Sequence, residues 1–355
     1  MPSLAKQAPV YYSDDSYTRL NEYINTTNHS NIFILVDSNT HENCLSYFMQ
    51  QLSTDKSIEV IEMEADEENK HIETCTGIWN VLQELDADRK SLLINLGGGV
   101  VTDLGGFVAC TYKRGITYIN VPTTLLSMVD ASVGGKTGVD LGSLKNQIGV
   151  ISQPEMVLID TKYLETLASQ EMRSGLAEIL KHGLIANRTY WEKATNLQEL
   201  TLEDLHDLIL ESVKIKTAIV EEDPKEKGLR KTLNFGHTLG HAIESYLLFH
   251  ESKSRILHGE AVAAGMIMAA YISNKLTGLS NEDFAIISEK ILDLYPKVPI
   301  EDSDFKEIIE LLKFDKKNTH GNIYFVLLKD IGTPVIDCKV PDNVLKDALN
   351  YYISL

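Results

Sequence analysis

The stretch Leu92-Leu-Ile-Asn-Leu-Gly97-Gly98-Gly99-Val-Val-Thr102-Asp103 decides the fold of the first half of this sequence. Its apolar start is typical of a buried strand, and the three successive glycines indicate a tight turn at the end of that strand. A helix that follows such a turn presents free backbone amides, which bind phosphate groups. We therefore expect a phosphate-binding turn here, with a tight turn that binds nothing as the alternative.

Similar short runs of β-branched residues lie on both sides of this stretch. They predict strands over residues 31–37, 57–63, 91–96, 115–121 and 156–160. Stretches of helical period, such as 77–85, lie between them, and alternation of strands with helices indicates a parallel sheet covered by helices. The sequence thus predicts an N-terminal Rossmann-like α/β domain over residues 1–169.

The second half has a different pattern. Helical periodicity predicts helices over 172–185, 202–220, 232–248, 259–276, 282–294 and 304–312, and a final helix near 344–352. Residues 322–328 and 332–335 favour a small hairpin. Residues 170–355 are therefore expected to form a mostly α-helical domain.

The sequence matches two familiar nucleotide-binding motifs only in part. The dinucleotide fingerprint fails because Thr102 replaces its third glycine and no acidic residue follows about 20 positions later. Gly135-Lys136-Thr137 resembles the end of a phosphate loop, but Asp130 stands where that loop needs a glycine. Neither motif alone identifies a ligand.

Histidines in the helical half suggest a metal. His237 and His241 are one turn apart on one face of a predicted helix, a spacing suited to a divalent cation. Other ionisable or polar residues stand nearby: Glu178, Lys181, His182, Asn234 and His258-Gly-Glu260. Spacing alone favours His237 with His241, but a hydrogen-bonded pair without metal has the same spacing, so the ligand set stays open.

Composition limits the classes of partner. With 355 residues and 43% hydrophobic content, the chain can bury a large core. Its 33 basic and 51 acidic residues give a net charge of -18, which disfavours nucleic acid and anionic membranes as partners. Basic residues nevertheless concentrate near the segments above, which predicts a pocket for a small anion: Lys113, Arg114, Lys136, Lys145, Lys181, Lys216, Arg230 and Lys231.

The expected location is the cytoplasm. The four cysteines form no C-x-x-C pair, so neither a disulfide scaffold nor a cysteine zinc site is suggested. The first 15 residues have no apolar region of a signal peptide, and no apolar stretch is long enough to span a bilayer.

Together these segments form a longer pattern. It includes Gly97-Gly-Gly-Val-Val-Thr-Asp103, Ser132-Val-Gly-Gly-Lys-Thr-Gly138, Gly175-Leu-Ala-Glu-Ile-Leu-Lys-His-Gly183, Arg230-Lys-Thr-Leu-Asn-Phe-Gly-His-Thr-Leu-Gly-His241 and His258-Gly-Glu260. The pattern resembles the 3-dehydroquinate synthase family over most of the chain.

The resemblance implies an enzyme of the shikimate pathway, a carbon-oxygen lyase that uses NAD and a divalent metal, zinc or cobalt. Such an enzyme converts 3-deoxy-D-arabino-heptulosonate 7-phosphate to 3-dehydroquinate and phosphate. The expected sequence is transient oxidation by NAD, phosphate elimination, re-reduction, ring opening and intramolecular aldol closure.

The resemblance also implies roles for individual residues. The metal ligands would be Glu178, His237 and His258, which leaves His241 as a pocket residue that moves protons. The remaining substrate residues would be Asp130, Lys136, Asn146, Lys181, Lys216, Arg230 and Asn234, with Arg114 reaching the phosphate across a homodimer interface and Lys316 or Lys317 entering from the C-terminal domain. The NAD contacts would be Asp37, Glu67, Lys70, Gly98, Gly99, Asp103, Thr123, Thr124, Lys145 and Thr166.

Three alternatives remain. Sister cyclases act on sedoheptulose 7-phosphate or glucose 6-phosphate, which lack the carboxylate. A metal-dependent alcohol dehydrogenase of the same architecture would release NADH. A non-catalytic ligand-binding relative would be expected to have lost a metal ligand or Lys136, and this chain retains them.

Overall fold

The computed structural model describes residues 7–142, 144–196, 201–250, 252–312 and 323–355. The chain divides into a first unit, Met1–Ala168, and a second unit, Ser169–Leu355. Within these described ranges, no helix is long and apolar enough to cross a membrane.

The first unit is built on a six-stranded parallel sheet with the order β1-β8-β5-β4-β2-β3. The strands of this unit are β1 (Val10–Tyr12), β2 (Ile32–Asp37), β3 (Ile58–Met63), β4 (Leu92–Gly97), β5 (Thr117–Pro122), β6 (Lys136–Leu141), β7 (Leu144–Ile151) and β8 (Val157–Ile159). Its α-helices are α1 (Ser13–Thr26), α2 (Ser38–Thr40), α3 (Ser46–Gln51), α4 (Ile72–Glu84) and α5 (Gly99–Thr111). The Rossmann-like α/β prediction is confirmed.

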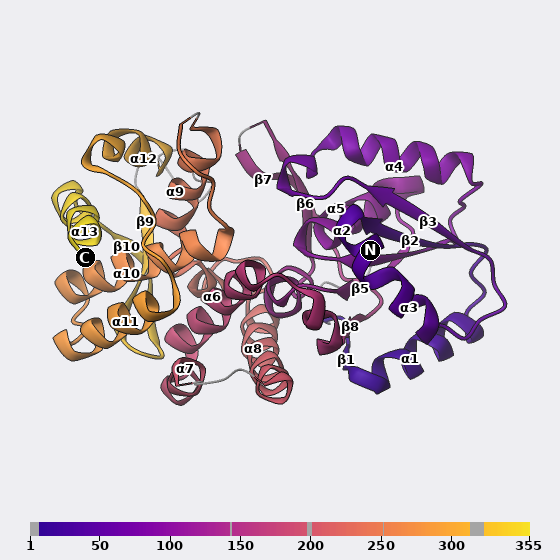
Figure 1. The fold of residues 1–355 in the computed structure, drawn as a ribbon, viewed down its shortest axis with the longest axis horizontal. Helices are drawn as coiled ribbons and strands as arrows, with labels where there is room; N and C mark the ends of the chain where they lie inside the picture. The colour runs from indigo at the N-terminus through magenta and orange to yellow at the C-terminus, as the bar shows by residue number, and fades with distance from the viewer. Residues whose placement is uncertain (1–6, 143, 197–200, 251, 313–322) are drawn as a thin grey trace. The chain divides into compact units, whose positions relative to one another are not determined.

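Helices cover both faces of this sheet. Figure 1 shows α4 on one side of the strands and α1 and α3 on the other. Strands β2 and β4 are buried along their whole length, as their uninterrupted apolar runs predict for central parallel strands. A core cluster containing Phe33, Leu35, Leu93, Leu104 and Val108 is fully buried.

Helix α5 lies unusually close to strand β4 because it carries glycine at the contact. A Cβ atom added at Gly105 would lie 2.1 Å from Oδ1 of Asn95. The Asn95 side chain is fully buried, and its Nδ2 donates a 2.9 Å hydrogen bond to Oδ1 of Asn120 on β5. The local excess of glycine therefore reflects packing as well as the turn before α5.

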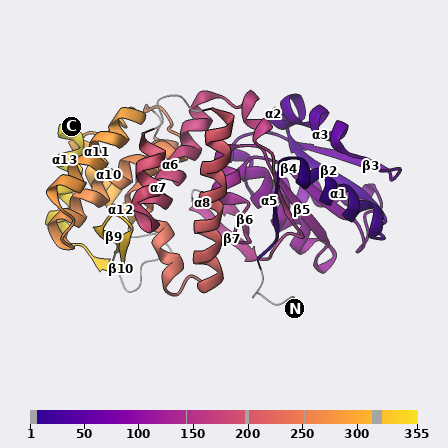
Figure 2. The ribbon, with the colours of Figure 1, turned by 90° about the horizontal axis from the view of Figure 1, so that it is seen from below.

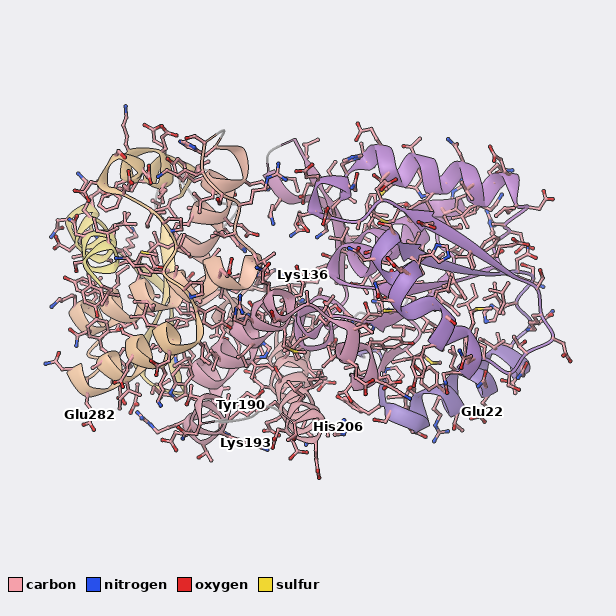
Figure 3. All side chains as sticks on the ribbon, viewed as in Figure 1. Glu22, Lys136, Tyr190, Lys193, His206 and Glu282 are labelled. Carbon is pink, nitrogen blue, oxygen red and sulfur yellow. The ribbon has the colours of Figure 1, made fainter. Side chains whose placement is uncertain are left out.

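The antiparallel pair β6 and β7 was not among the predicted strands. Its first residue is Lys136, labelled in Figure 3. Gly138 and Gly149 face each other across the pair, and a Cβ atom on Gly138 would lie 2.5 Å from the Ile148 carbonyl oxygen. The glycines that make this close approach also weaken the strand pattern, which explains why the pair escapes prediction.

The second unit is mostly helical, as predicted. Its helices are α6 (Ser169–Ala186), α7 (Arg188–Thr195), α8 (Leu202–Glu222), α9 (His237–Phe249), α10 (His258–Leu276), α11 (Asn281–Leu294), α12 (Phe305–Leu312) and α13 (Asp342–Ser354). Strands β9 (Tyr324–Asp330) and β10 (Thr333–Lys339) form an antiparallel hairpin where the sequence predicts one.

Helix α10 is the centre of this unit. It packs against α6, α9, α11, α13 and β9, and most of its residues from Gly259 to Ser273 are buried. Figure 2 shows α6, α7 and α8 side by side. The hydroxyl of Tyr190 on α7, labelled in Figure 3, donates a 2.7 Å hydrogen bond to the Leu208 carbonyl on α8.

One helix prediction is wrong at its start. Residues 232–248 were expected to form one helix, but Leu229–Asn234 form a short 3-10 helix and α9 begins only at His237. Gly236 separates the two with a φ of +78°, in the left-handed region that favours glycine. This break makes His237 the first residue of a new helix.

A candidate metal centre and a candidate dinucleotide site

The second unit gathers ionisable side chains around a buried carboxylate. Glu178 lies in the middle of α6 and is fully buried. Its Oε2 atom accepts a hydrogen bond from Nζ of Lys181, which is also buried and lies one turn later on the same helix. The other carboxylate oxygen, Oε1, accepts no hydrogen bond of normal geometry from the described residues. Glu178 therefore has one buried oxygen that the ion pair with Lys181 does not use.

Two imidazoles approach that oxygen. Nε2 of His237, the first residue of α9, is 3.3 Å from Oε1 of Glu178. Nε2 of His258, the first residue of α10, is 3.7 Å from the same atom. Donors bound tetrahedrally to zinc at about 2.0–2.1 Å lie about 3.4 Å apart, so these two separations suit a shared ion. One carboxylate oxygen and two imidazole nitrogens thus fit zinc or cobalt.

His241 also belongs to this cluster. Its ring centroid lies 5.0 Å from that of His237 and 5.6 Å from that of His258. One nitrogen from each of the three histidines falls within a single group whose atoms are within 4.8 Å of one another. The geometry therefore leaves His241 available either as a ligand or as a neighbour that exchanges protons.

The pKa values of these groups depend on their shared burial. Burial alone would raise the pKa of Glu178, but Lys181 and His237 outweigh it and hold that pKa well below its usual range. Burial, with Lys181 nearby, lowers the pKa of His237, which favours a neutral ring. Burial would also lower the pKa of His258, but the carboxylates of Glu244 and Glu178 raise it to about 10.

A backbone loop presents two further predicted residues. Arg230 is buried within the 3-10 helix Leu229–Asn234, and its guanidinium donates a 3.0 Å hydrogen bond to the Pro224 carbonyl. Asn234 donates through Nδ2 to Oε1 of Glu226 at 2.7 Å. This 3-10 helix packs against α6 and α8, and α8 carries the buried Lys216.

Asp223 organises that loop and was missed by the sequence analysis. Its carboxylate accepts hydrogen bonds from the backbone amides of Lys227 at 3.0 Å, Gly228 at 2.6 Å and Arg230 at 3.1 Å. Burial alone would raise its pKa, but these amides outweigh burial and lower it. Its position at the end of a predicted helix, a few residues before a glycine, was the available signal.

The first unit forms a separate candidate site where β4 ends. Gly98 caps α5, and the amide of Thr123, after β5, donates a 3.0 Å hydrogen bond to the Gly97 carbonyl. A Cβ atom on Gly98 would lie 3.1 Å from the Thr124 side chain. In the sheet order, β4 and β3 lie on opposite sides of β2, so the topology switches between β2 and β4. Ligands of open α/β sheets bind at such a switch.

Five predicted cofactor or substrate residues of this unit form three contacts. Nζ of the buried Lys70 lies 2.7 Å from Oδ2 of Asp103 and 2.8 Å from Oδ1 of Asn146. Burial would lower the pKa of Lys70, but Asp103 and Glu67 raise it instead. Nζ of Lys145 lies 3.3 Å from Oε1 of Glu67. The side chains predicted separately thus share one polar network.

Asp37 and Thr166 form hydrogen bonds outside this network. Asp37 ends β2 and caps α2, where its carboxylate accepts from both the amide and the hydroxyl of Thr40 at 2.8 Å. Thr166 is exposed and donates to the Tyr163 carbonyl at 3.3 Å. Arg114 is exposed at φ +71°, and Asp130 is half-buried. Lys316 and Lys317 lie outside the described residues.

The fold and these residues define a class: a protein with an α/β unit suited to a dinucleotide and a helical unit suited to a divalent metal. The family model of 3-dehydroquinate synthase N-terminal matches residues 60–174, and that of the C-terminal part matches residues 175–318. The chain is also 41% identical over 345 residues to 3-dehydroquinate synthase from Parabacteroides distasonis, with 97% of both chains covered. The chain belongs to the 3-dehydroquinate synthase family.

Solved structures with the same fold include other cyclases. A 2-deoxy-scyllo-inosose synthase complexed with carbaglucose-6-phosphate, NAD+ and Co2+ has a TM-score of 0.84 and 25% identity, covering 98% of this chain and 99% of its own. A 2-epi-5-epi-valiolone synthase from Streptomyces hygroscopicus, with NAD+ and Zn2+ bound, has a TM-score of 0.81 and 23% identity, covering 98% of this chain and 97% of its own. The latter likeness concerns the fold alone.

Proposed function

We propose that this chain is a 3-dehydroquinate synthase, which converts 3-deoxy-D-arabino-heptulosonate 7-phosphate to 3-dehydroquinate and phosphate. The observation that carries the proposal is the buried Glu178 oxygen, with Nε2 of His237 and His258 at 3.3 and 3.7 Å, in a chain of this family. The 41% identity to a relative of that name over nearly its whole length supports the same substrate.

The two units would hold different groups. Glu178, His237 and His258 would bind zinc or cobalt, and the amides at Gly98 and Gly99 would bind the pyrophosphate of NAD at the start of α5. The ends of β2 and β4 support a dinucleotide there, because the topology switches between these strands. When bound, NAD accepts and returns a hydride while the metal polarises substrate oxygens.

The anionic ends of the substrate call for cationic partners. Lys216 and Arg230 are buried cations at 6% and 2% exposure, and ammonium and guanidinium groups bind carboxylate and phosphate through charge-assisted hydrogen bonds. We assign them, with Lys136, to the carboxylate and phosphate of the substrate. Asp130, Asn146 and Asn234 would bind hydroxyl groups, which both donate and accept hydrogen bonds.

We assign proton transfer to two groups near Glu178, namely Lys181 and His241. The Nζ of Lys181 donates to Glu178, and its remaining N–H groups can donate to a developing oxyanion. A ring nitrogen of His241 would accept a proton from the substrate and return it, since an imidazole nitrogen can serve as general base and general acid. The net reaction needs no added base.

A sister cyclase activity is the second candidate, because the fold of 2-deoxy-scyllo-inosose synthase covers 98% of this chain. The two candidates differ in one substrate group: sedoheptulose 7-phosphate and glucose 6-phosphate lack the carboxylate of the heptulosonate. Phosphate release should therefore be compared for the three sugar phosphates, each with NAD and zinc.

The proposal predicts release from the heptulosonate alone, with 3-dehydroquinate identified by chromatography against an authentic sample. As a control, Arg230→Lys keeps the charge but changes the bidentate geometry, so it should raise KM more than it lowers kcat. Release from a sugar phosphate without the carboxylate, and none from the heptulosonate, would reassign the protein to the sister cyclases.

Two further features belong to the proposal. A cytoplasmic location is supported by the cysteines, all four of which are free thiols. A homodimer is proposed from Arg114, which is exposed on a turn in the left-handed region together with Lys113 and Gly115. Sedimentation at assay concentration tests the dimer, and a fully active monomer would contradict it.

A further inference from the structure

The carboxylate of Glu244 contacts His258 on the side of the ring that faces away from Glu178. Glu244 lies on α9 and is 5% exposed. Its Oε2 atom is 3.2 Å from Nδ1 of His258, while Nε2 of the same ring is 3.7 Å from Oε1 of Glu178. The imidazole therefore bridges two carboxylates, one through each nitrogen.

The position of Glu244 on α9 explains why it reaches this ring. It follows His237 by seven residues and His241 by three, so the three side chains share one face of the helix. His258 begins the next helix, α10, which packs against α9. Because the two helices are in contact, a residue of α9 can fix the ring of a residue at the start of α10.

The hydrogen-bond chemistry determines where the ring proton lies. An ionised carboxylate only accepts hydrogen bonds, so Nδ1 of His258 must donate to Glu244. A ring that binds a metal ion must give up its second proton, so the lone pair of His258 then lies on Nε2, the atom that faces Glu178. His237 has the same arrangement, since its Nδ1 donates to the Phe235 carbonyl at 3.1 Å and its Nε2 faces Glu178.

We propose that Glu244 is a positioning residue for the metal centre: it holds the His258 ring in the orientation and tautomer that direct Nε2 toward the ion. The inference rests on the proposed metal role of Glu178, His237 and His258. A carboxylate behind a ligating imidazole also makes that imidazole a stronger donor than a carbonyl does, so His258 should gain more from Glu244 than His237 gains from Phe235.

The test measures cobalt binding to the full-length protein stripped of metal, by competition with a chromogenic chelator. The visible d–d absorption of bound Co2+ is recorded in parallel. Glu244→Ala should weaken Co2+ binding by about 10- to 100-fold and change the d–d spectrum, because the ring is free to rotate or to change tautomer. Glu244→Gln retains an accepting oxygen without the charge, so its loss should be smaller and its spectrum closer to that of the wild type.

Tyr246→Phe is the matched control. Tyr246 lies two residues further along α9 and donates a buried 2.7 Å hydrogen bond to Oδ1 of Asp304. This variant loses a comparable buried hydrogen bond and should keep wild-type cobalt affinity and spectrum. Far-UV circular dichroism checks that each variant is folded, and Glu244→Gln serves if Glu244→Ala is not.

The outcomes separate the two proposals. Wild-type cobalt affinity and spectrum in the folded Glu244 variants would overturn the positioning role, and so would an equal loss in Tyr246→Phe. If the wild-type protein itself binds no Co2+, or if Glu178→Gln binds it as well as the wild type does, the proposed metal centre fails.

Discussion

A pair of glycine substitutions in two helices of the first unit tests how closely α5 packs on the sheet. Gly105→Ala adds a methyl group that would lie 2.1 Å from Oδ1 of Asn95 and 2.9 Å from Cδ2 of Leu35. The Asn95 side chain is fully buried and bonded to Asn120, so it has little freedom to yield. Gly77→Ala, in α4, meets no atom within 4 Å.

The expected effects have opposite signs. Replacing glycine by alanine inside a helix stabilises it by about 1 kcal/mol, and this gain should appear nearly in full for Gly77→Ala. Forcing an extra carbon into a packed site costs about 1–3 kcal/mol, and the short distance at Gly105 favours the upper end of that range. Gly105→Ala should therefore lower the free energy of unfolding of the first unit by about 2 kcal/mol.

Urea titration measures both values. The chain has two tryptophans, Trp79 in α4 and Trp191 in α7, so Trp79 fluorescence in a Trp191→Phe background reports the first unit. Equal stability changes in the two glycine variants, or stabilisation by Gly105→Ala, would refute the close packing of α5 on β4.

Four further substitutions test the polar sites. Glu178→Gln should abolish phosphate release while the protein stays folded, because the metal loses its anionic ligand; near-normal turnover at saturating zinc would disprove that role. Lys70→Met removes the buried cation beside the half-buried Asp103 and should destabilise the first unit by about 3 kcal/mol. Adding Asp103→Asn should recover part of this loss, whereas strict additivity would show that the two side chains do not interact. The Asp223 carboxylate has a lowered pKa, so its contribution to stability is present above its unfolded pKa of about 3.9 and is lost as the pH falls through its folded pKa. The difference in unfolding free energy between wild type and Asp223→Asn should thus shrink below about pH 4 in urea titrations, and a difference independent of pH would contradict the loop role of Asp223.

Strands and helices with strong periodicity were predictable from the sequence. The short, β-branched apolar runs of β2 and β4 favour buried strands, and the long helices of the second unit match their predicted ranges within a few residues. Elements that contain glycine at a close backbone contact or at a break between helices were harder to predict. The β6–β7 pair contains glycines where strands usually have branched residues, and Gly236 divides a continuous helical pattern through its backbone conformation.

The residues of the candidate metal centre were also only partly predictable from the sequence. The i, i+4 spacing of His237 and His241 gives two residues of the cluster, but spacing cannot bring in His258 or Glu178, which come from other helices. Those two came from the family resemblance, and the distances to Glu178 agree with it. Glu244 and Asp223 act through other residues, so their roles depend on contacts that a single sequence does not record.

The central claim is that NAD is used and regenerated within each turnover. The most direct measurement combines the zinc-loaded protein, the heptulosonate phosphate and a small amount of NAD, and follows phosphate and NADH together, before and after metal removal by EDTA. We expect phosphate in large excess over NAD, no lasting NADH, loss of phosphate release with EDTA and recovery with zinc or cobalt. Accumulation of NADH in step with product would contradict it and indicate a dehydrogenase.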